Sequence, residues 1–303
     1  MRMPHKACTI SWLLLIAIVG AARLTSAAAD APGEKIGDFL KYANGTALDT
    51  RTNLMWMTQD FRNLEGRAPK SWDEALAWAA NDAKDLSLVI ADEQTSGRGR
   101  LDRKWFTPPG TALAFSLILR PTADEKPHLS RTVGWAALAV ADALRTRQLT
   151  PQIKWPNDVL LLGHKVSGIL VESVWSGEEI DCVVIGIGIN VLKGSVPPID
   201  MLQFPATSLE DELGYPPERA EILFDILSNL INLRPQLGTE EFLSRWSESL
   251  AFLGEQVQAE VGSGLPITGQ LLGLESDGSL RLRDGHDKTV AVRFGDVRLR
   301  PLA

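Results

Sequence analysis

Hydrophobic positions follow two different spacings along the middle of the chain, and each spacing predicts its own elements. Apolar runs predict strands over residues 86–92, 112–121 and 182–191, and three strands joined by turns over 151–175. Apolar residues spaced by three or four positions predict helices over 131–147, 217–233 and 239–250. Ser130 is placed to cap the first helix, and Gly163-His164 to form the last tight turn within 151–175.

A different pattern begins at Gly254, where short apolar stretches alternate with turn residues. The expected strands cover residues 256–261, 267–275, 279–284 and 289–300, with turns at 276–278 and 284–286. Short strands at this spacing are typical of a small β-barrel. The pattern therefore predicts an α+β protein, in which a mixed sheet with helices over residues 86–250 is followed by a separate barrel over 251–303.

Upstream of residue 86 the chain has another character. Residues 1–29 combine Arg2 and Lys6 with an apolar run and an alanine-rich exit. This order is typical of a secretory signal peptide, and the apolar run is too short for a membrane span. We expect residues 1 to about 40 to form an isolated helix and coil. Further on, residues 53–57 predict a short strand, and Ser71 is expected to cap a helix over 72–83.

Composition narrows the possible functions. The 303 residues carry a net charge of −7, which disfavours a broad nucleic-acid-binding surface, and no DNA-binding helix-turn-helix can be identified. Cys182 stands in an apolar strand, and no His or Asp is spaced to activate it, so we expect a core residue. The four histidines are scattered and predict no metal cluster.

Positive charge is concentrated in one short segment of this acidic chain. The stretch "DEQTSGRGRLDRKW", residues 92–105, places Arg98, Arg100 and Arg103 among glycines. Gly97 and Gly99 let the backbone approach a ligand closely, and arginine forks suit phosphate and carboxylate groups. A solvated charge run is the ordinary alternative. We interpret the segment as a flexible anion-binding loop.

Two further motifs support a binding site. "KWPND" over residues 154–158 is followed by Lys165, and "GIGIN" over 186–190 ends the apolar strand. Each motif alone fits an ordinary turn, an exposed hairpin lysine or tight sheet packing. Together with the cationic loop they favour a nucleotide site that lacks a Walker motif. Asn157 and Asp158 can read adenine or ribose edges or hold Mg²⁺.

These stretches, with "KVSGILVE" at 165–172 and "ATSL" at 206–209, resemble biotin protein ligases in order and spacing over about residues 86–301. The resemblance implies a class II synthetase-like catalytic domain over 86–250 and an SH3-like C-terminal barrel over 251–303. It also implies a two-step reaction. Biotin and ATP form biotinyl-5'-AMP, and the biotinyl group is then transferred to a lysine of a biotin carboxyl carrier protein, a subunit of acetyl-CoA carboxylase.

The resemblance also implies the roles of individual residues. Lys165, Arg98 and Arg100 are the expected catalytic residues. The biotin side is expected to comprise Gln94, Gly97, Arg98, Gly99, Lys165, Gly168 and Ile169. The nucleotide side is expected to comprise Arg100, Arg103, Trp105, Asn157, Asp158 and Asn190, with Mg²⁺ held through Asp158.

The chain departs from the family pattern in two places. Asp102 replaces a loop glycine, which stiffens the loop and adds negative charge. The family's "STN" motif, which holds the ureido ring of biotin, is missing; Ser71 is the nearest substitute at that distance. Residues 42–81 instead resemble the opening of an unrelated family of secreted bacterial domains. We therefore interpret residues 30–85 as a partial secreted-domain-like segment joined to a ligase domain without its first strand and helix.

Three hypotheses follow from the sequence. The chain is an ATP-dependent biotin protein ligase, an inactive nucleotide-binding remnant of one, or a secreted domain carrying a passenger ligase portion. Because ATP and the carrier are cytoplasmic, we favour cytoplasmic action, although the signal-like segment points to the periplasm or to secretion. We expect no membrane span beyond that segment. The oligomeric state is left open, a homodimer included.

Overall fold

A six-stranded sheet forms the centre of this computed structural model, with the strand order β5-β6-β10-β9-β8-β7. Its strands are β5 (Leu88–Ala91), β6 (Ala112–Leu119), β7 (Pro151–Lys154), β8 (Asp158–Leu161), β9 (His164–Ser176) and β10 (Glu179–Asn190). The pairings between neighbouring strands are antiparallel. Among the described residues, parallel pairing is limited to the isolated bridges Ile153–Leu250 and Lys165–Ala206, so the predicted mixed character of the sheet is confined to them.

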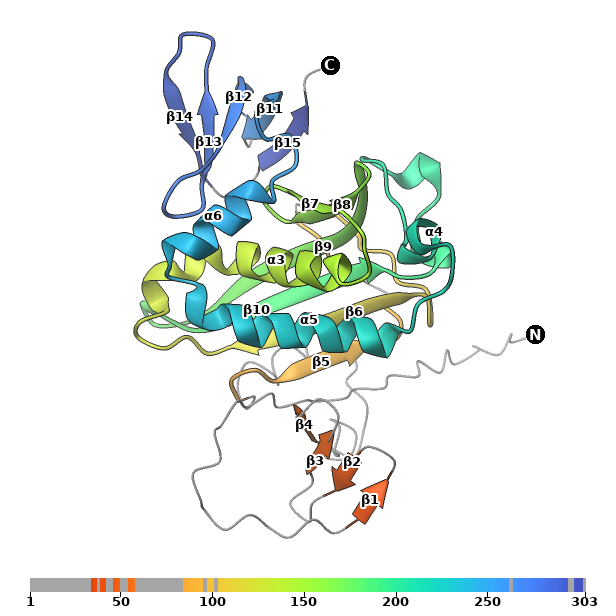
Figure 1. Cartoon of the computed structure of the whole chain (residues 1–303). Coiled ribbons are helices and arrows are strands. Elements are labelled where there is room, and N and C mark those ends of the chain that lie inside the picture. Colours follow the sequence, from red (N-terminus) through yellow and green to blue (C-terminus); the bar gives the residue numbers. More distant parts are fainter. Residues whose placement is uncertain are drawn as a thin grey trace, which may run out of the picture.

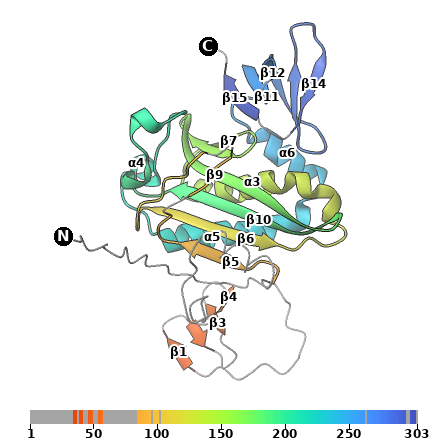
Figure 2. The ribbon, with the colours of Figure 1, turned by 180° about the vertical axis from the view of Figure 1, so that it is seen from behind.

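Helices cover one face of this sheet (Figure 1). They are α3 (Thr132–Arg145), α5 (Arg219–Leu233) and α6 (Glu240–Glu248), with the short α4 (Leu209–Leu213) at the edge. Short 3-10 turns lie at η1 (Lys126–Arg131), η2 (Lys193–Ser195), η3 (Ile199–Met201) and η4 (Arg234–Gln236). Figure 2 turns the other face of the sheet toward the reader, with α3 and α5 behind it. The three helices predicted from apolar spacing are confirmed, whereas α4 was not predicted.

The predicted cap of α3 is wrong. Arg131 is the N-cap of α3, and it makes no side-chain capping bond. The Ser130 hydroxyl instead donates a hydrogen bond to the carbonyl oxygen of Asp277, at 2.8 Å. The 3-10 turn η1 leads directly into α3, so the chain needs no capping side chain there. A tight turn was predicted at Gly163-His164; the structure has it one residue earlier, with positive φ at both Leu162 and Gly163, and His164 already begins β9.

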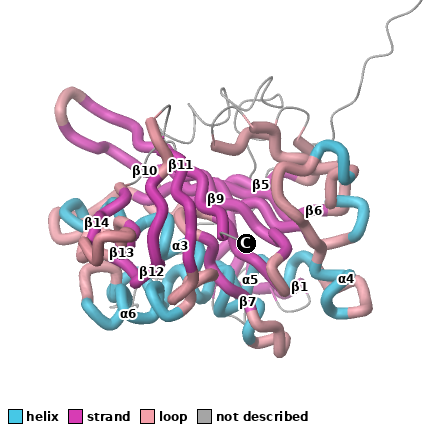
Figure 3. Tube along the Cα trace, turned by 90° about the horizontal axis from the view of Figure 1, so that it is seen from above, coloured by secondary structure: helices cyan, strands magenta, loops and turns pink. Residues whose placement is uncertain are grey.

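The C-terminal part forms a second, five-stranded antiparallel sheet in the order β14-β13-β12-β11-β15. Its strands are β11 (Gln256–Val261), β12 (Ile267–Leu274), β13 (Leu280–Arg283), β14 (Thr289–Val292) and β15 (Val297–Pro301). The segment expected as one strand over 289–300 is therefore two strands. This sheet lies beyond α6, on one side of the central sheet (Figure 1; Figure 3). Its likeness to an SH3 barrel stays a prediction.

One apolar core joins both sheets. Leu138 and Val140 of α3 belong to the same buried cluster as Ile185 and Ile189 of β10 and Leu271 of β12. Cys182 is fully buried, as its apolar surroundings predicted, and burial raises the pKa of its thiol. The shared core means that the C-terminal sheet is packed against the central domain rather than tethered to it.

The structure describes residues 84–94, 97–100, 103–261, 264–293 and 297–301. It also gives the backbones of four N-terminal strands, β1 (Glu34–Ile36), β2 (Phe39–Lys41), β3 (Thr46–Asp49) and β4 (Leu54–Met57), paired in sequence order. β4 confirms the predicted strand at 53–57, whereas β1 and β2 contradict the helix and coil expected up to residue 40. The signal-like segment, the helix over 72–83, Ser71 and Asp102 lie outside the described residues. No helix among the described residues is long and apolar enough to cross a membrane.

Candidate functional site

A row of small residues crosses the open face of the central sheet. Ala91, Ala114, Gly188 and Gly168 are paired in register across β5, β6, β10 and β9. The next partner of Gly168, on β8, is Asp158. Because side chains alternate between faces along a strand, the neighbouring Ile187 and Ile189 point into the core instead. The row therefore forms a shallow trough that ends at a carboxylate.

The cationic segment folds over this trough as an irregular hairpin. Its two arms are joined by backbone bonds from Trp105 to Gly97 and from Gly99 to Arg103, at 2.9 and 2.7 Å. A β-carbon at Gly97 would lie 2.4 Å from the carbonyl oxygen of Trp105, so the arms require glycine at this position. The predicted glycine-rich loop is therefore held by its own backbone bonds in this structure.

Trp105 lies directly on the glycines of the trough. A β-carbon added to Gly188 would lie 2.3 Å from its indole ring, and one added to Gly168 would lie 3.2 Å away. The ammonium group of Lys165 stands 5.4 Å from the ring centroid, in cation–π contact. The two glycines thus create the space that the indole occupies. They place an apolar wall beside a positive charge.

Lys165 forms an ion pair with Asp158, Nζ to Oδ1, at 2.6 Å. Lys154 approaches the other carboxylate oxygen, Oδ2, at 3.7 Å. Burial alone would raise the pKa of Asp158, but the two lysines outweigh it and hold that pKa below its usual range. Burial lowers the pKa of Lys154 to about 8, against the opposing effect of Asp158. The site therefore carries an ionised carboxylate between two lysines.

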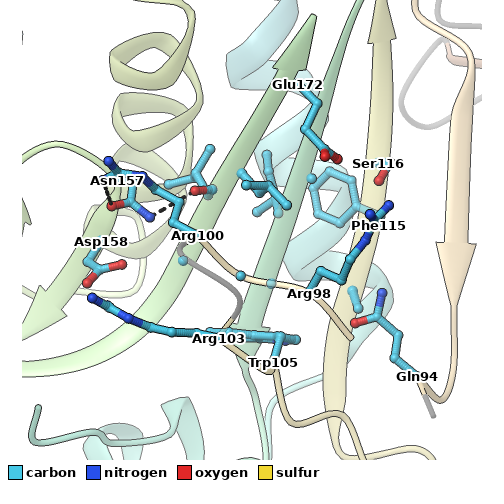
Figure 4. Close-up of a pocket in the computed structure, with 18 of the residues that line it drawn as sticks. Gln94, Arg98, Arg100, Arg103, Trp105, Phe115, Ser116, Asn157, Asp158 and Glu172 are labelled. Carbon is cyan, nitrogen blue, oxygen red and sulfur yellow. Dashed lines mark hydrogen bonds between the residues drawn. The ribbon is translucent and has the colours of Figure 1, made fainter. Parts of the chain in front are cut away.

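Asn157 links the loop to the sheet. Nη1 of Arg100 donates to its Oδ1 at 3.1 Å, while its own Nδ2 donates to the carbonyl oxygen of Ile169 at 2.9 Å. The Ile169 amide in turn donates to the Asn157 carbonyl oxygen at 2.8 Å. Figure 4 shows Arg100 and Asn157 meeting above the strands, with Asp158 beside them. Asn157 thus ties a loop arginine to the strand that carries Lys165.

Pro205 and the "ATSL" segment that follows it hold the backbone of Lys165. The Lys165 amide donates to Pro205 at 2.7 Å, and the Thr207 amide donates back to Lys165 at 2.9 Å. Asn190 is buried, and its Nδ2 donates to the carbonyl oxygen of Thr207 at 3.0 Å. The motifs recognised at 154–158, 186–190 and 206–209 therefore converge on one lysine. Sequence spacing alone could not show this convergence.

Two adjoining cavities share the hairpin and the ion pair. The first contains about 830 Å³ of empty space and the second about 1440 Å³, both including open solvent. Predicted residues that line both are Gln94, Arg103, Trp105, Asp158 and Lys165. The first alone is lined by Arg98, Gly99, Arg100, Asn157, Gly168 and Ile169, and the second alone by Gly97 and Asn190. All predicted site residues therefore line one site, although the cavities do not divide them as the sequence predicted.

Several lining residues were missed by sequence reasoning. On the open face, Ser116, Leu170 and Glu172 continue the alternation of Ala114 and Gly168, so that period-two pattern could have indicated them. Figure 4 shows Ser116 and Glu172 at the end of the cavity away from Asp158.

The second cavity adds residues from more distant segments. The ring of Phe204 stands between Lys154 and Arg300, at 4.6 and 5.3 Å from its centroid. Arg300 comes from the C-terminal sheet, and no local pattern indicates it.

The described residues do not form a metal site of their own. No group of three or more His, Cys, Asp or Glu side chains gathers anywhere among them, and the Asp158 carboxylate is paired with lysines. Mg²⁺ is commonly held by one or two carboxylates together with the phosphates of a nucleotide. A ligand role for Asp158 toward such an ion stays a prediction.

The arrangement suits a reaction between two anionic groups, whose repulsion the surrounding positive charges would offset. Lysine and arginine charges surround a trough whose floor is glycine and whose wall is an indole ring. Positive groups fixed in place stabilise negative charge that develops during a reaction, most strongly where water is excluded. The hairpin lies over the trough and covers it.

Comparison with known proteins gives consistent matches. The model of the biotin/lipoate A/B protein ligase family matches residues 69–190. A biotin–[acetyl-CoA-carboxylase] ligase of Paracoccus denitrificans is 36% identical over 205 residues, which cover 64% of this chain and 83% of that protein. The bifunctional ligase/repressor BirA of Bacillus spizizenii is 35% identical over 210 residues, covering 67% of this chain and 63% of the relative. The chain thus spans less than two thirds of that repressor.

Solved structures agree with the sequence relatives. The biotin protein ligase from Aquifex aeolicus in complex with biotin and ATP has a TM-score of 0.65 at 32% identity. The match covers 75% of this chain and 94% of that one. The apo structure of biotin protein ligase from the same organism has a TM-score of 0.57 at 27% identity.

Proposed function

The chain is a member of the biotin protein ligase family, and on that premise we propose that it is an ATP-dependent biotin protein ligase. It forms biotinyl-5'-AMP and transfers the biotinyl group to a lysine of a biotin carboxyl carrier protein. The observation that carries this proposal is the position of Lys165, at the junction of the two cavities, with its ammonium 2.6 Å from Asp158 and over the ring of Trp105. A group there faces both substrates at once.

The trough suits the apolar part of biotin. Gly168 and Gly188 seat the indole of Trp105 on the sheet as an apolar wall, and Leu170 extends the apolar floor beside it. Gln94, Gly97, Arg98 and Gly99 form the biotin side of the hairpin in this proposal. The biotin carboxylate then points toward Lys165, which would neutralise it.

The nucleotide is proposed to approach from the side of the second cavity. Asn190 lines that cavity, while Asp158, Arg103 and Trp105 border both cavities. Arg100 and Asn157 are joined at the first cavity and position the loop over the nucleotide's α-phosphate. The carboxylate oxygen of biotin attacks that phosphorus, the bond to pyrophosphate breaks, and Lys165, Arg98 and Arg100 stabilise the charge on the transferring group.

The second step needs a dry and covered intermediate. The lysine amine of the carrier attacks the carbonyl carbon of the mixed anhydride, and AMP leaves. The hairpin over the trough limits the access of water to this anhydride. We propose that the reaction takes place in the cytoplasm, because ATP and the carrier are cytoplasmic.

The direct test is biotin incorporation into a purified biotin carrier domain. The full chain, ATP, Mg²⁺ and biotin should label the carrier on one lysine, and a carrier with that lysine replaced by arginine should stay unlabelled. Calorimetry with biotin and with ATP separates this proposal from the remnant hypothesis. Binding of ATP without any binding of biotin, together with an unlabelled carrier, would favour a nucleotide-binding remnant.

A further inference from the structure

One turn of the C-terminal sheet is hydrogen-bonded to the central domain at three consecutive residues. The carbonyl oxygens of Ser276, Asp277 and Gly278, between β12 and β13, all accept hydrogen bonds from residues of the central domain. Nε and Nη2 of Arg131 donate to Ser276 at 2.9 and 2.6 Å. The same guanidinium donates to the carbonyl oxygens of Leu237 and Thr239, so it is itself fixed from two sides.

The third contact leads directly to the candidate site. The indole Nε1 of Trp155 donates to the carbonyl oxygen of Gly278 at 3.0 Å, and the ring is fully buried. Trp155 belongs to the "KWPND" segment, between Lys154 and the Asn157-Asp158 pair. The strand before it is also held, because Ile153 exchanges backbone bonds with Ser249 and Ala251 at 2.7 and 2.9 Å. Residues 249–251 lead into β11.

We propose that Trp155 is a positioning residue through which the C-terminal sheet fixes the Asn157-Asp158 turn for the nucleotide. This inference rests on the proposed function. On the other side of the turn, Asn157 contacts Arg100 and Ile169, and Asp158 contacts Lys165. The turn is therefore held between the catalytic lysine and the C-terminal sheet. Loss of the indole bond should let the turn shift without removing any group that contacts a substrate.

The chain offers a matched control. Trp135 of α3 is also fully buried, and its Nε1 donates to a backbone carbonyl, that of Leu230 in α5, at 2.9 Å. This bond joins two helices, and Trp135 does not line either cavity. Trp155→Phe and Trp135→Phe remove the same donor from equally buried sites. They differ in whether the lost bond supports the candidate site.

The first measurement is hydrogen exchange of the full chain without ligand, read on peptides that span residues 155–169. In Trp155→Phe, the amide of Ile169 and its neighbours should exchange at least about fivefold faster than in the parent, because the turn opens locally. Trp135→Phe should leave these peptides unchanged. Equal exchange in the two variants would overturn the inference, whether or not the chain is a ligase.

The second measurement is the steady-state rate of biotin-dependent pyrophosphate exchange. In Trp155→Phe, KM for ATP should rise about tenfold, the size of one lost buried hydrogen bond, with KM for biotin within about twofold of the parent. An equal rise in both KM values, or the same change in Trp135→Phe, would show a merely structural role. No exchange in the parent would refute the proposed function, and the hydrogen-exchange result would still decide this inference.

A milder variant covers the case in which Trp155→Phe does not fold. Ser130 is exposed, and in the described contacts its hydroxyl bonds only to the same turn, so Ser130→Ala loosens the turn with little risk to folding. KM for ATP should then rise about twofold to threefold, which corresponds to a loss of less than about 1 kcal/mol of binding free energy. No rise in KM and no faster exchange at residues 155–169 would overturn the inference.

Discussion

The two faces of the central sheet use the same strands for opposite purposes. Along β10, Ile185, Ile187 and Ile189 enter the core beneath the helices, while Gly186 and Gly188 leave the other face open. One face carries branched side chains. On the other face the glycines have no side chain, so Trp105 and a ligand can approach the backbone. Stability and binding are thus assigned to alternate residues of a single strand.

The same division holds for charge. On the helical side, the half-buried guanidinium of Arg234, at the end of α5, is paired with both Asp85 and Glu125. The open face has more positive than negative groups near Asp158, and burial holds the pKa of Lys154 down to about 8. On the helical side one guanidinium has two carboxylate partners, whereas on the open face Lys154, Lys165 and Arg103 all act on the single carboxylate of Asp158. Variants on each face should therefore fail in different assays.

The largest effect is expected for Lys165→Ala on the open face. The rate of biotin-dependent pyrophosphate exchange should fall about a hundredfold to a thousandfold, as for the loss of one preorganised charge donor. Circular dichroism should show that the variant is folded. An unchanged exchange rate in a folded variant would mean that Lys165 has no role in adenylation.

The opposite result is expected for Ile189→Ala on the covered face. Its side chain is fully buried, so the free energy of unfolding should fall by about 3 kcal/mol, the usual cost of such a cavity. Exchange activity per folded molecule should stay within about twofold of the parent, because the side chain points away from the trough. Urea unfolding and the exchange assay, done on one preparation, test both statements. A stable but inactive Ile189→Ala would break the proposed division.

Lys154 should give the open face a pH dependence. Since its pKa is about 8, its charge is lost as pH rises through that value, and KM for ATP should increase. The lysine titrates near 10.5 when unfolded, so the unfolded chain binds more protons between these values and stability should rise with pH there. Lys154→Met should abolish the step in KM near pH 8. A step that persists in this variant would assign it to another group.

The smallest effect is expected at Glu125, which precedes η1 and pairs with Arg234 at the end of α5. Hydrogen bonding to Arg234 holds the pKa of its carboxyl below the usual value, so its contribution to stability is present above pH 4.5 and is lost as pH falls further. Glu125→Gln should flatten the pH dependence of unfolding below that value by about 1 kcal/mol or less. The exchange rate at neutral pH should not change. If Glu125→Gln lost activity without losing stability, Glu125 would not belong with the residues that affect stability alone.

The sequence indicated part of this division, because an apolar run and the glycines within it are local features. The strand over 182–191 was predicted from its continuous apolar run, and Gly186 and Gly188 were expected to let a ligand approach the backbone. The tight turn was expected at Gly163-His164 and lies one residue earlier, at Leu162-Gly163. The resemblance added the roles of Lys165 and the loop arginines, and all of these residues line one site.

What could not be predicted depends on distant partners. Ser130 was expected to cap α3, but its hydroxyl donates to Asp277, far along the chain. Trp155 contacts Gly278 for the same reason, and Arg300 reaches Phe204 from β15. No local pattern encodes such contacts, since each depends on how the C-terminal sheet docks.

The central claim is that biotin binds on the glycine face, and calorimetric titration of Gly188→Ala with biotin tests it most directly. A β-carbon there would lie 2.3 Å from the ring of Trp105, so the indole must move out of its place. The account predicts that the parent and Ile189→Ala bind biotin alike, while Gly188→Ala binds it at least about tenfold more weakly, as expected when such a contact is lost. Equal affinity in Gly188→Ala and the parent would contradict the account.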